Sequence, residues 1–134
     1  MERLAILVVL MGLAVVVALL LQRRRPDPPS APSYRAPRQL DRDDFARPEA
    51  ATLVVVFASE TCDSCPGVWD LVAPFESETT AVQQITVQSD AELHKRYQID
   101  GVPTTIVAEA DGAVVKAFFG PVVADDLAEA VELA

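Results

Sequence analysis

The pattern of hydrophobic and polar residues divides the chain into three stretches. Residues 4–21 contain no charged residue and almost no polar one. Residues 26–37 hold five prolines among small and polar residues, and from Arg38 onward short apolar runs alternate with polar ones. We therefore expect an N-terminal membrane anchor with an arginine flank (1–25), a proline-rich linker (26–37) and one globular domain (38–134).

The first stretch has the length and composition of a membrane-spanning helix. At about 1.5 Å per residue it would extend about 27 Å, close to the thickness of the hydrocarbon core of a bilayer. A core helix of a soluble protein would have a polar face, and this segment has none. The alternative is a cleaved signal peptide, whose apolar region is shorter and precedes a cleavage site of small residues. Here Arg23–Arg25 follow instead, and we expect a single-pass anchor in the cell membrane through residues 4–21.

The arginines also bear on the side of the membrane that the domain occupies. Arg23–Arg25 follow the apolar segment, whereas the preceding Arg3 is offset by Glu2. Positive residues near the ends of a membrane helix favour the cytoplasmic side. The charges therefore modestly favour a cytoplasmic domain.

Within the domain, the apolar pattern predicts alternating strands and helices. The run Thr52–Ala58 is β-branched and apolar, which is typical of a strand buried on both faces. Further strands are expected at 38–40, 84–88, 104–109 and 113–119, and helices at 41–46, from the cysteines to about 78, at 90–97 and at 125–133. Pro74 should kink the long helix, and Leu127 and Val131 should share the buried face of the last one. This order predicts an α/β fold with a central mixed sheet flanked by helices.

The two cysteines of the chain, Cys62 and Cys65, are spaced C-x-x-C directly after the predicted central strand. We expect Cys62 at the first turn of the following helix, where unpaired N–H groups and the helix dipole favour the nucleophilic thiolate. Cys65 lies three residues later, more buried by the helix, and can close a disulfide with Cys62. This pattern indicates dithiol–disulfide exchange, in which Cys62 attacks and Cys65 resolves the mixed disulfide.

Other interpretations of the cysteine pair account for fewer features of the sequence. A structural zinc site needs four ligands, and the chain offers two cysteines and one distant histidine, His94. A copper-handling pair would want a partner histidine, and we expect His94 to be a solvated helix residue without a role. A structural disulfide in so small a ring would constrain the unfolded chain little. We therefore expect no metal and no cofactor.

The charge of the domain limits its partners. From Arg38 to Ala134 there are six Lys and Arg residues against eighteen Asp and Glu residues, a net charge of −12. Such a domain repels phosphate backbones, so nucleic acid is not an expected partner. We attribute the acidity to solubility rather than to recognition of a basic partner.

Several features in sequence order are similar to the thioredoxin family. They are the strand LVVVFA, the motif Cys62-Asp63-Ser64-Cys65, the segment Tyr97-Gln98-Ile99-Asp100-Gly101-Val102-Pro103-Thr104, the Asp111-Gly112 hairpin and Gly120. The resemblance covers residues 38–134. It implies a thioredoxin-like fold preceded by one transmembrane helix, with Pro103 cis beside the cysteine pair and Val102 binding the backbone of a substrate chain.

The chain departs from thioredoxins at two positions near the cysteines. Thr61 stands where thioredoxins carry a tryptophan, and Val56 where they carry a buried aspartate that relays protons. Because valine cannot move protons, deprotonation of Cys65 would need Glu60, water or the substrate. The resemblance implies a membrane-tethered thiol–disulfide oxidoreductase acting on protein thiols and disulfides, with a further partner that recharges it. The alternative is a non-catalytic thioredoxin-like module that docks a membrane partner.

Overall fold

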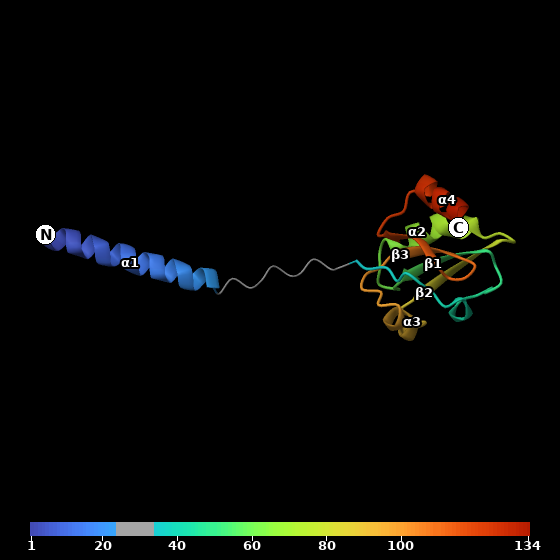
Figure 1. Cartoon of the computed structure of the whole chain (residues 1–134), viewed down its shortest axis with the longest axis horizontal. Coiled ribbons are helices and arrows are strands. Elements are labelled where there is room, and N and C mark those ends of the chain that lie inside the picture. The colour runs from blue at the N-terminus through green and yellow to red at the C-terminus, as the bar shows by residue number, and fades with distance from the viewer. Residues whose placement is uncertain (24–33) are drawn as a thin grey trace. The chain divides into compact units, whose positions relative to one another are not determined.

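The computed structural model describes residues 1–23 and 34–134 of the chain, which divides into two compact units, residues 1–31 and 32–134 (Figure 1). Each unit is described on its own. Arg24 and Arg25 of the predicted arginine flank lie outside the described residues. The predicted linker, residues 26–37, lies outside them too, except for its last four residues.

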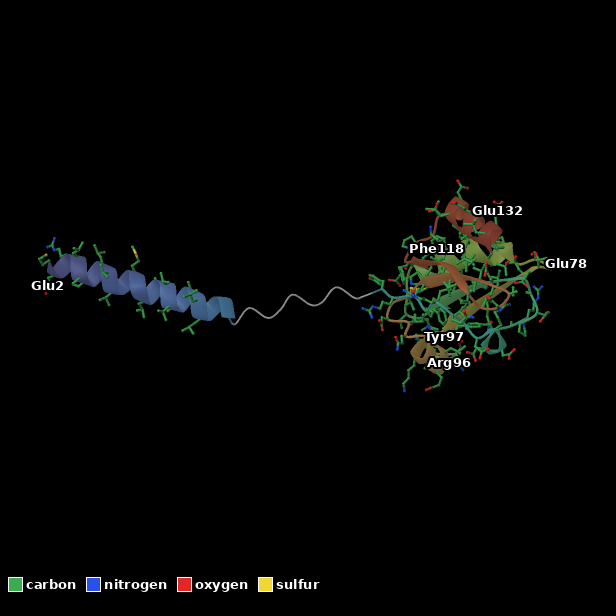
Figure 2. All side chains as sticks on the ribbon, in the orientation of Figure 1. Glu2, Glu78, Arg96, Tyr97, Phe118 and Glu132 are labelled. Carbon is green, nitrogen blue, oxygen red and sulfur yellow. A yellow bond between two sulfur atoms is a disulfide. The ribbon has the colours of Figure 1, made fainter. Side chains whose placement is uncertain are left out.

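The first unit contains the helix α1 (Glu2–Arg23). Its apolar side chains project on every side (Figure 2), and those from Leu4 to Leu20 are exposed to solvent. A helix of a soluble protein would bury at least one face of its apolar side chains. The segment Glu2–Leu20 is therefore a candidate membrane span, by its length and its composition.

The second unit is built on a mixed four-stranded sheet in the order β2-β1-β3-β4. The strand β1 pairs in parallel with β2, whereas β3 is antiparallel to both of its neighbours, β1 and β4. The bounds of the strands are Thr52–Ala58 for β1, Thr80–Thr86 for β2, Thr104–Glu109 for β3 and Val114–Phe119 for β4.

The central strand β1 is buried along its whole length, as its β-branched run predicts. Its side chains alternate between two apolar clusters, because successive residues of a strand point to opposite faces. Leu53, Val55 and Phe57 belong to one cluster, together with Phe45 and Tyr97. Val54, Val56 and Ala58 belong to the other, which also contains Cys65, Val68, Val72, Leu127 and Ala130.

Helices cover both faces of the sheet. The helices α2 (Cys65–Val72) and α4 (Ala124–Leu133) pack on the Val56 face, and α3 (Ala91–Arg96) packs on the Phe57 face. Figure 1 shows α2 and α4 together, on the opposite side of the sheet from α3. The predicted mixed sheet flanked by helices is thereby confirmed, and Leu127 of α4 is fully buried while Val131 is half-buried against the same cluster.

Several elements differ from the prediction. The predicted strand 38–40 is only an isolated bridge at Gln39, and the predicted helix 41–46 is the three-residue 3-10 turn η1 (Arg42–Asp44), because contacts with the β3–β4 hairpin and with Tyr97 fix this segment. The helix after the cysteines ends at Val72 rather than near Glu78, and a 3-10 turn, η2 (Ala73–Phe75), follows it. Pro74 explains this, because it has no N–H to donate to Asp70 and its ring crowds the preceding turn. The strand β2 begins at Thr80 rather than at residue 84, because residues 80–82 pair with residues 52–54 of β1.

The segment before β1 closes the domain against the hairpin between β3 and β4. Gln39 forms an isolated antiparallel bridge with Ala113, and the Leu40 N–H donates to the Gly112 carbonyl at 2.8 Å. A Cβ at Gly112 would lie 1.9 Å from the Leu40 carbonyl oxygen, so only glycine fits at this turn. The 3-10 turn η1 (Arg42–Asp44) then follows, and the Asp41 side chain caps it by accepting a hydrogen bond from the Asp43 N–H.

The buried Tyr97 ties this segment to α3. Its hydroxyl donates a hydrogen bond to the Asp44 carboxylate and accepts one from the Asp41 N–H at 3.0 Å. Its ring packs against Phe45, with the ring centres 5.7 Å apart. Arg96 adds ion pairs to Asp41 and Asp44 at the surface.

Replacing Tyr97 by Phe should lower the free energy of unfolding by about 1 kcal/mol at neutral pH, because both hydrogen bonds are lost. Burial and the hydrogen bond to Asp44 raise the pKa of Tyr97 to about 12 from an ordinary 10.0. The folded state thus holds this proton more tightly, so the stabilisation is present below about pH 10 and is lost as the pH rises through about 12.

Denaturant unfolding of both proteins at pH 7 and between pH 10 and 12 measures this. The Tyr97→Phe variant should lack the part of the alkaline loss of stability that belongs to Tyr97. Identical stability curves for the two proteins would contradict the assignment.

Candidate active site around the cysteine pair

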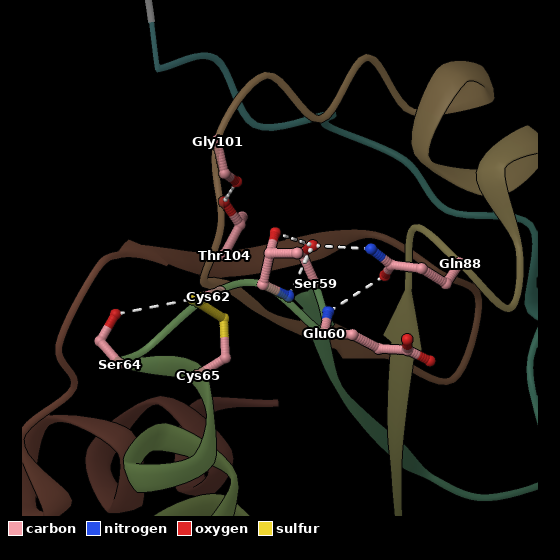
Figure 3. The surroundings of a disulfide bond; sticks show 9 residues. Ser59, Glu60, Cys62, Ser64, Cys65, Gln88, Gly101 and Thr104 are labelled. Carbon is pink, nitrogen blue, oxygen red and sulfur yellow. Dashed lines mark hydrogen bonds between the residues drawn. A yellow bond between two sulfur atoms is a disulfide. The ribbon is translucent and has the colours of Figure 1, made fainter.

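Cys62 and Cys65 form a disulfide immediately after β1, with their Cα atoms 5.5 Å apart (Figure 3). The two cysteines differ in exposure: Cys62 is half-buried, whereas Cys65 is 2% exposed. Cys65 is held in the apolar cluster beneath the sheet, against Val56 and Val68. An incoming sulfur atom therefore has access to Cys62 rather than to Cys65.

The helix begins later than predicted. The first residue of α2 is Cys65, so Cys62 lies three residues before the helix and not in its first turn. The Ser64-Cys65-Pro66 sequence accounts for this start, because a proline is well tolerated in the first turn of a helix, where its missing N–H would have no helical partner. The Cys62 N–H donates instead to the Ser59 carbonyl at 3.1 Å, which closes a turn at the end of β1.

Ser64 is a site residue that the sequence analysis did not single out. Its Oγ lies 3.7 Å from the Cys62 Sγ, within hydrogen-bonding distance for sulfur (Figure 3). A hydroxyl at this place can donate to a thiolate and stabilise its charge after reduction. Its position inside the C-x-x-C motif is the only signal that the sequence offers for this role.

The segment before β3 lies against the cysteine pair. The Val102–Pro103 peptide bond is cis, Pro103 is buried, and Val102 packs against the cluster that includes Cys62 and Cys65. The Thr104 hydroxyl donates to the Gly101 carbonyl at 2.7 Å, and the Gly120 N–H donates to the Pro103 carbonyl at 2.9 Å. These bonds hold the Val102–Pro103 segment between the disulfide and the end of β4.

An open cavity of about 390 Å³ adjoins Cys62. Its walls come from the turn after β1, from Val87 just after β2, from α3 and from the segment before Pro103, and one wall is the imidazole of His94. The lining residues are Ser59, Thr61, Cys62, Val87, His94, Ile99, Asp100, Gly101 and Val102.

His94 is not the solvated helix residue that the sequence predicted. It is 6% exposed, and its ring stands edge-on against Phe57 with the ring centres 5.1 Å apart. Its Nδ1 lies 3.1 Å from the Asp90 carbonyl oxygen. Because a carbonyl only accepts, Nδ1 carries a proton. The prediction failed because His94 lies on the side of α3 that faces the sheet. The polar sequence of this short helix does not indicate which of its sides is buried.

In the described part of the chain, no buried Asp or Glu lies beneath the cysteines. Val56, where thioredoxins carry an aspartate, is fully buried in the same cluster as Cys65. Glu60 is exposed, and its carboxylate points away from the disulfide in Figure 3. Among the residues that the structure describes, no group of three or more His, Cys, Asp and Glu side chains could hold a metal ion.

A mixed sheet flanked by helices, with a C-x-x-C disulfide after its central strand and a cis-proline beside it, defines a thioredoxin-like domain, and this domain forms the second unit of the chain. A thioredoxin variant from Halobacterium salinarum NRC-1 is similar to it, with a TM-score of 0.55 and 27% identity over 63% of this chain and 74% of that one.

Two further thioredoxins share the fold. The germline-specific thioredoxin Deadhead from Drosophila melanogaster has a TM-score of 0.54 and 21% identity over 64% of this chain and 83% of its own. The thioredoxin of Fasciola hepatica has a TM-score of 0.55 and 22% identity over the same shares. No family model and no curated protein sequence matches the chain.

Replacing Ser64 by Ala should slow alkylation of Cys62 in the reduced protein about fivefold at pH 7, because the thiolate loses a hydrogen bond. The Ser64→Thr variant keeps the hydroxyl and is the matched control. Iodoacetamide kinetics between pH 5 and 9 measure the effect as a shift of the reactivity profile toward higher pH. A profile unchanged in Ser64→Ala, or shifted equally in both variants, would exclude the hydrogen bond as the cause.

Proposed function

We propose that the protein is a membrane-tethered thiol–disulfide oxidoreductase that exchanges a dithiol and a disulfide with protein partners. The observation that carries the proposal is the unequal exposure of the two cysteines in one disulfide, with Cys62 open to a cavity and Cys65 buried. A structural disulfide has no need of such asymmetry. The thioredoxins of similar fold support the same class of activity.

The reaction transfers two electrons between the protein and its client. In the reduced protein, the Cys62 thiolate attacks one sulfur of a client disulfide, which forms a mixed disulfide and releases the other client sulfur as a thiolate. The Cys65 thiolate then attacks the Cys62 Sγ, which closes the Cys62–Cys65 disulfide and releases the second client thiolate. A separate dithiol partner must reduce the pair again. No cofactor takes part in these steps.

Val102 and Pro103 are the proposed binding residues for the client backbone. In the part of the chain that the structure describes, no hydrogen bond uses the N–H or the carbonyl of Val102. An extended client segment can therefore pair with this residue, as a strand adds to a free sheet edge. The buried Pro103 keeps that edge next to Cys62.

The absence of a proton relay at Val56 shapes the mechanism. Cys65 lies among apolar side chains, which disfavour a buried thiolate. In this proposal, water that enters with the opened disulfide, or the departing client thiolate, takes the Cys65 proton. Release of the mixed disulfide is then the slow step.

Residues 4–21 are the proposed membrane anchor, the linker (26–37) joins it to the domain (38–134), and Arg23–Arg25 modestly favour a cytoplasmic domain. The apolar side chains from Leu4 to Leu20 are exposed in the described part of their unit, which supports a bilayer as their surroundings. The acidic charge of the domain argues against a nucleic-acid partner. Tethering brings the domain to clients and a reductant at the same membrane.

Redox titration of the full chain in detergent against glutathione and dithiothreitol buffers should give one reversible two-electron transition, between about −300 and −100 mV. The Cys65→Ser variant should accumulate a mixed disulfide with a disulfide-containing client, and Cys62→Ser should form none. Non-reducing gels measure the trapping, and each single variant is the control for the other.

A pair of cysteines that cannot be cycled, or a partner that binds Cys62→Ser as well as the wild type, would favour the non-catalytic binding module instead. Equal trapping by the two variants would show that Cys62 is not the attacking residue.

The anchor predicts that the full chain stays in the membrane pellet after extraction at alkaline pH, and that a variant lacking residues 4–21 is released. A membrane-impermeant thiol reagent, applied to reduced intact cells, should label Cys62 only after the membrane is permeabilised. Labelling without permeabilisation would place the domain on the outer side, against the charge rule.

A further inference from the structure

Exposed apolar side chains are few in the second unit, and they are unevenly placed. Among the described residues from Tyr34 onward, the exposed large apolar side chains are Tyr34, Val87, Phe119, Val123 and Leu133. Val87 lines the cavity beside Cys62. Tyr34 and Phe119 are the aromatic members, and their rings contact each other with centres 5.4 Å apart.

Both aromatic rings lie beside the segment that holds Pro103. Phe119 is paired with Thr104 across β3 and β4, and the next residue, Gly120, donates its N–H to the Pro103 carbonyl. Tyr34 lies against Gly101, where an added Cβ would be 3.1 Å from the Tyr34 Cε1 atom. In Figure 3, Gly101 lies on the loop that leads past the disulfide to Thr104, the first residue of β3.

Tyr34 comes from the end of the stretch that the sequence analysis assigned to the linker. It is 58% exposed, although it contacts two residues more than sixty positions away in the sequence. Exposing a large aromatic ring to water is unfavourable in free energy, and exposed aromatic residues are enriched at binding surfaces.

We propose that Tyr34, together with Phe119, forms the surface that binds an apolar or aromatic side chain next to the disulfide-bonded cysteine of a client. The inference rests on the proposed function. The occupant follows from position. Tyr34 lies against Gly101, and Gly101 and Val102 line the same cavity as Cys62. In the proposed function, the ligand that enters this cavity to react with Cys62 is a polypeptide carrying a disulfide.

Tyr34 and Phe119 offer a client an aromatic contact that the residue before Cys62 does not. Thr61, which precedes Cys62, offers no aromatic ring to a client, whereas Tyr34 and Phe119 expose two rings beside the segment from Gly101 to Thr104. Because Tyr34 belongs to the chain that leads to α1, the segment between anchor and domain contributes to client specificity. Tyr34 is then a binding residue, and the redox chemistry of Cys62 and Cys65 does not depend on it.

The test uses the full chain in detergent, reduced, with three disulfides: hydroxyethyl disulfide, a peptide disulfide with Phe next to each cysteine, and the same peptide with Ser there. We expect the wild type to prefer the Phe peptide about tenfold. Tyr34→Ala should lose most of that preference and react normally with hydroxyethyl disulfide. Tyr34→Phe should keep the preference, and Leu133→Ala, which removes an equally exposed apolar side chain from α4, should match the wild type.

The outcomes separate this inference from the proposed function. Normal reaction of Tyr34→Ala with all three disulfides would overturn the inference alone. Faster reaction of Tyr34→Ala with the Phe peptide would also overturn it, because Tyr34 would then cover the client site rather than form it. Failure of the wild type to react even with hydroxyethyl disulfide would overturn the proposed function and this inference with it.

Discussion

The burial of β1 on both faces is the constraint on which the rest of the second unit depends. Six consecutive residues, Leu53–Ala58, are fully buried, and they supply the centre of both apolar clusters. Such a strand has to lie inside a sheet that is covered on both sides, so β2 and β3 must flank it and helices must cover its two faces. Only three residues separate the end of β1 from Cys62. The burial of β1 therefore also sets the position of the cysteine pair relative to the sheet.

That placement gives two chemically similar residues different environments. Cys65 begins α2 and is packed among apolar side chains of the Val56 face, while Cys62 stays in the turn above, beside Ser64 and an open cavity. The substitution of an apolar Val56 for an acid makes this face of the core uniformly apolar, which favours packing and removes a proton carrier. The opposite face buries an imidazole instead. His94 packs edge-on against Phe57, and its Nδ1–H donates a hydrogen bond to the Asp90 carbonyl.

The segment before β1 does more than connect the domain to the rest of the chain. Residues 38–44 extend the sheet by a bridge to Ala113, cap a 3-10 turn and meet Tyr97, and Tyr34 reaches the edge of the cysteine site. An anchored domain whose connecting segment also borders its reactive edge would link where the protein is held to what it can bind. Thr61 offers no aromatic ring before the first cysteine, and the two exposed rings next to Gly101 and Thr104 come from segments far apart in the sequence.

The sequence by itself determined the parts that rest on local pattern. These are the apolar helix α1, the buried strand β1 at its observed bounds, the hairpin at Gly112, and the cysteine pair with Cys65 as its more buried member. The end of α2 at Val72, the start of β2 at Thr80, the burial of His94 and the contacts of Ser64 and Tyr34 were decided by tertiary structure. Each of these depends on a partner far along the chain or on the direction of a side chain in a turn. Thr52 pairs with Thr80 and so extends β2, Phe57 covers His94, and Phe119 and Gly101 contact Tyr34. Local periodicity carries no information about such partners, because they meet only when the sheet has formed.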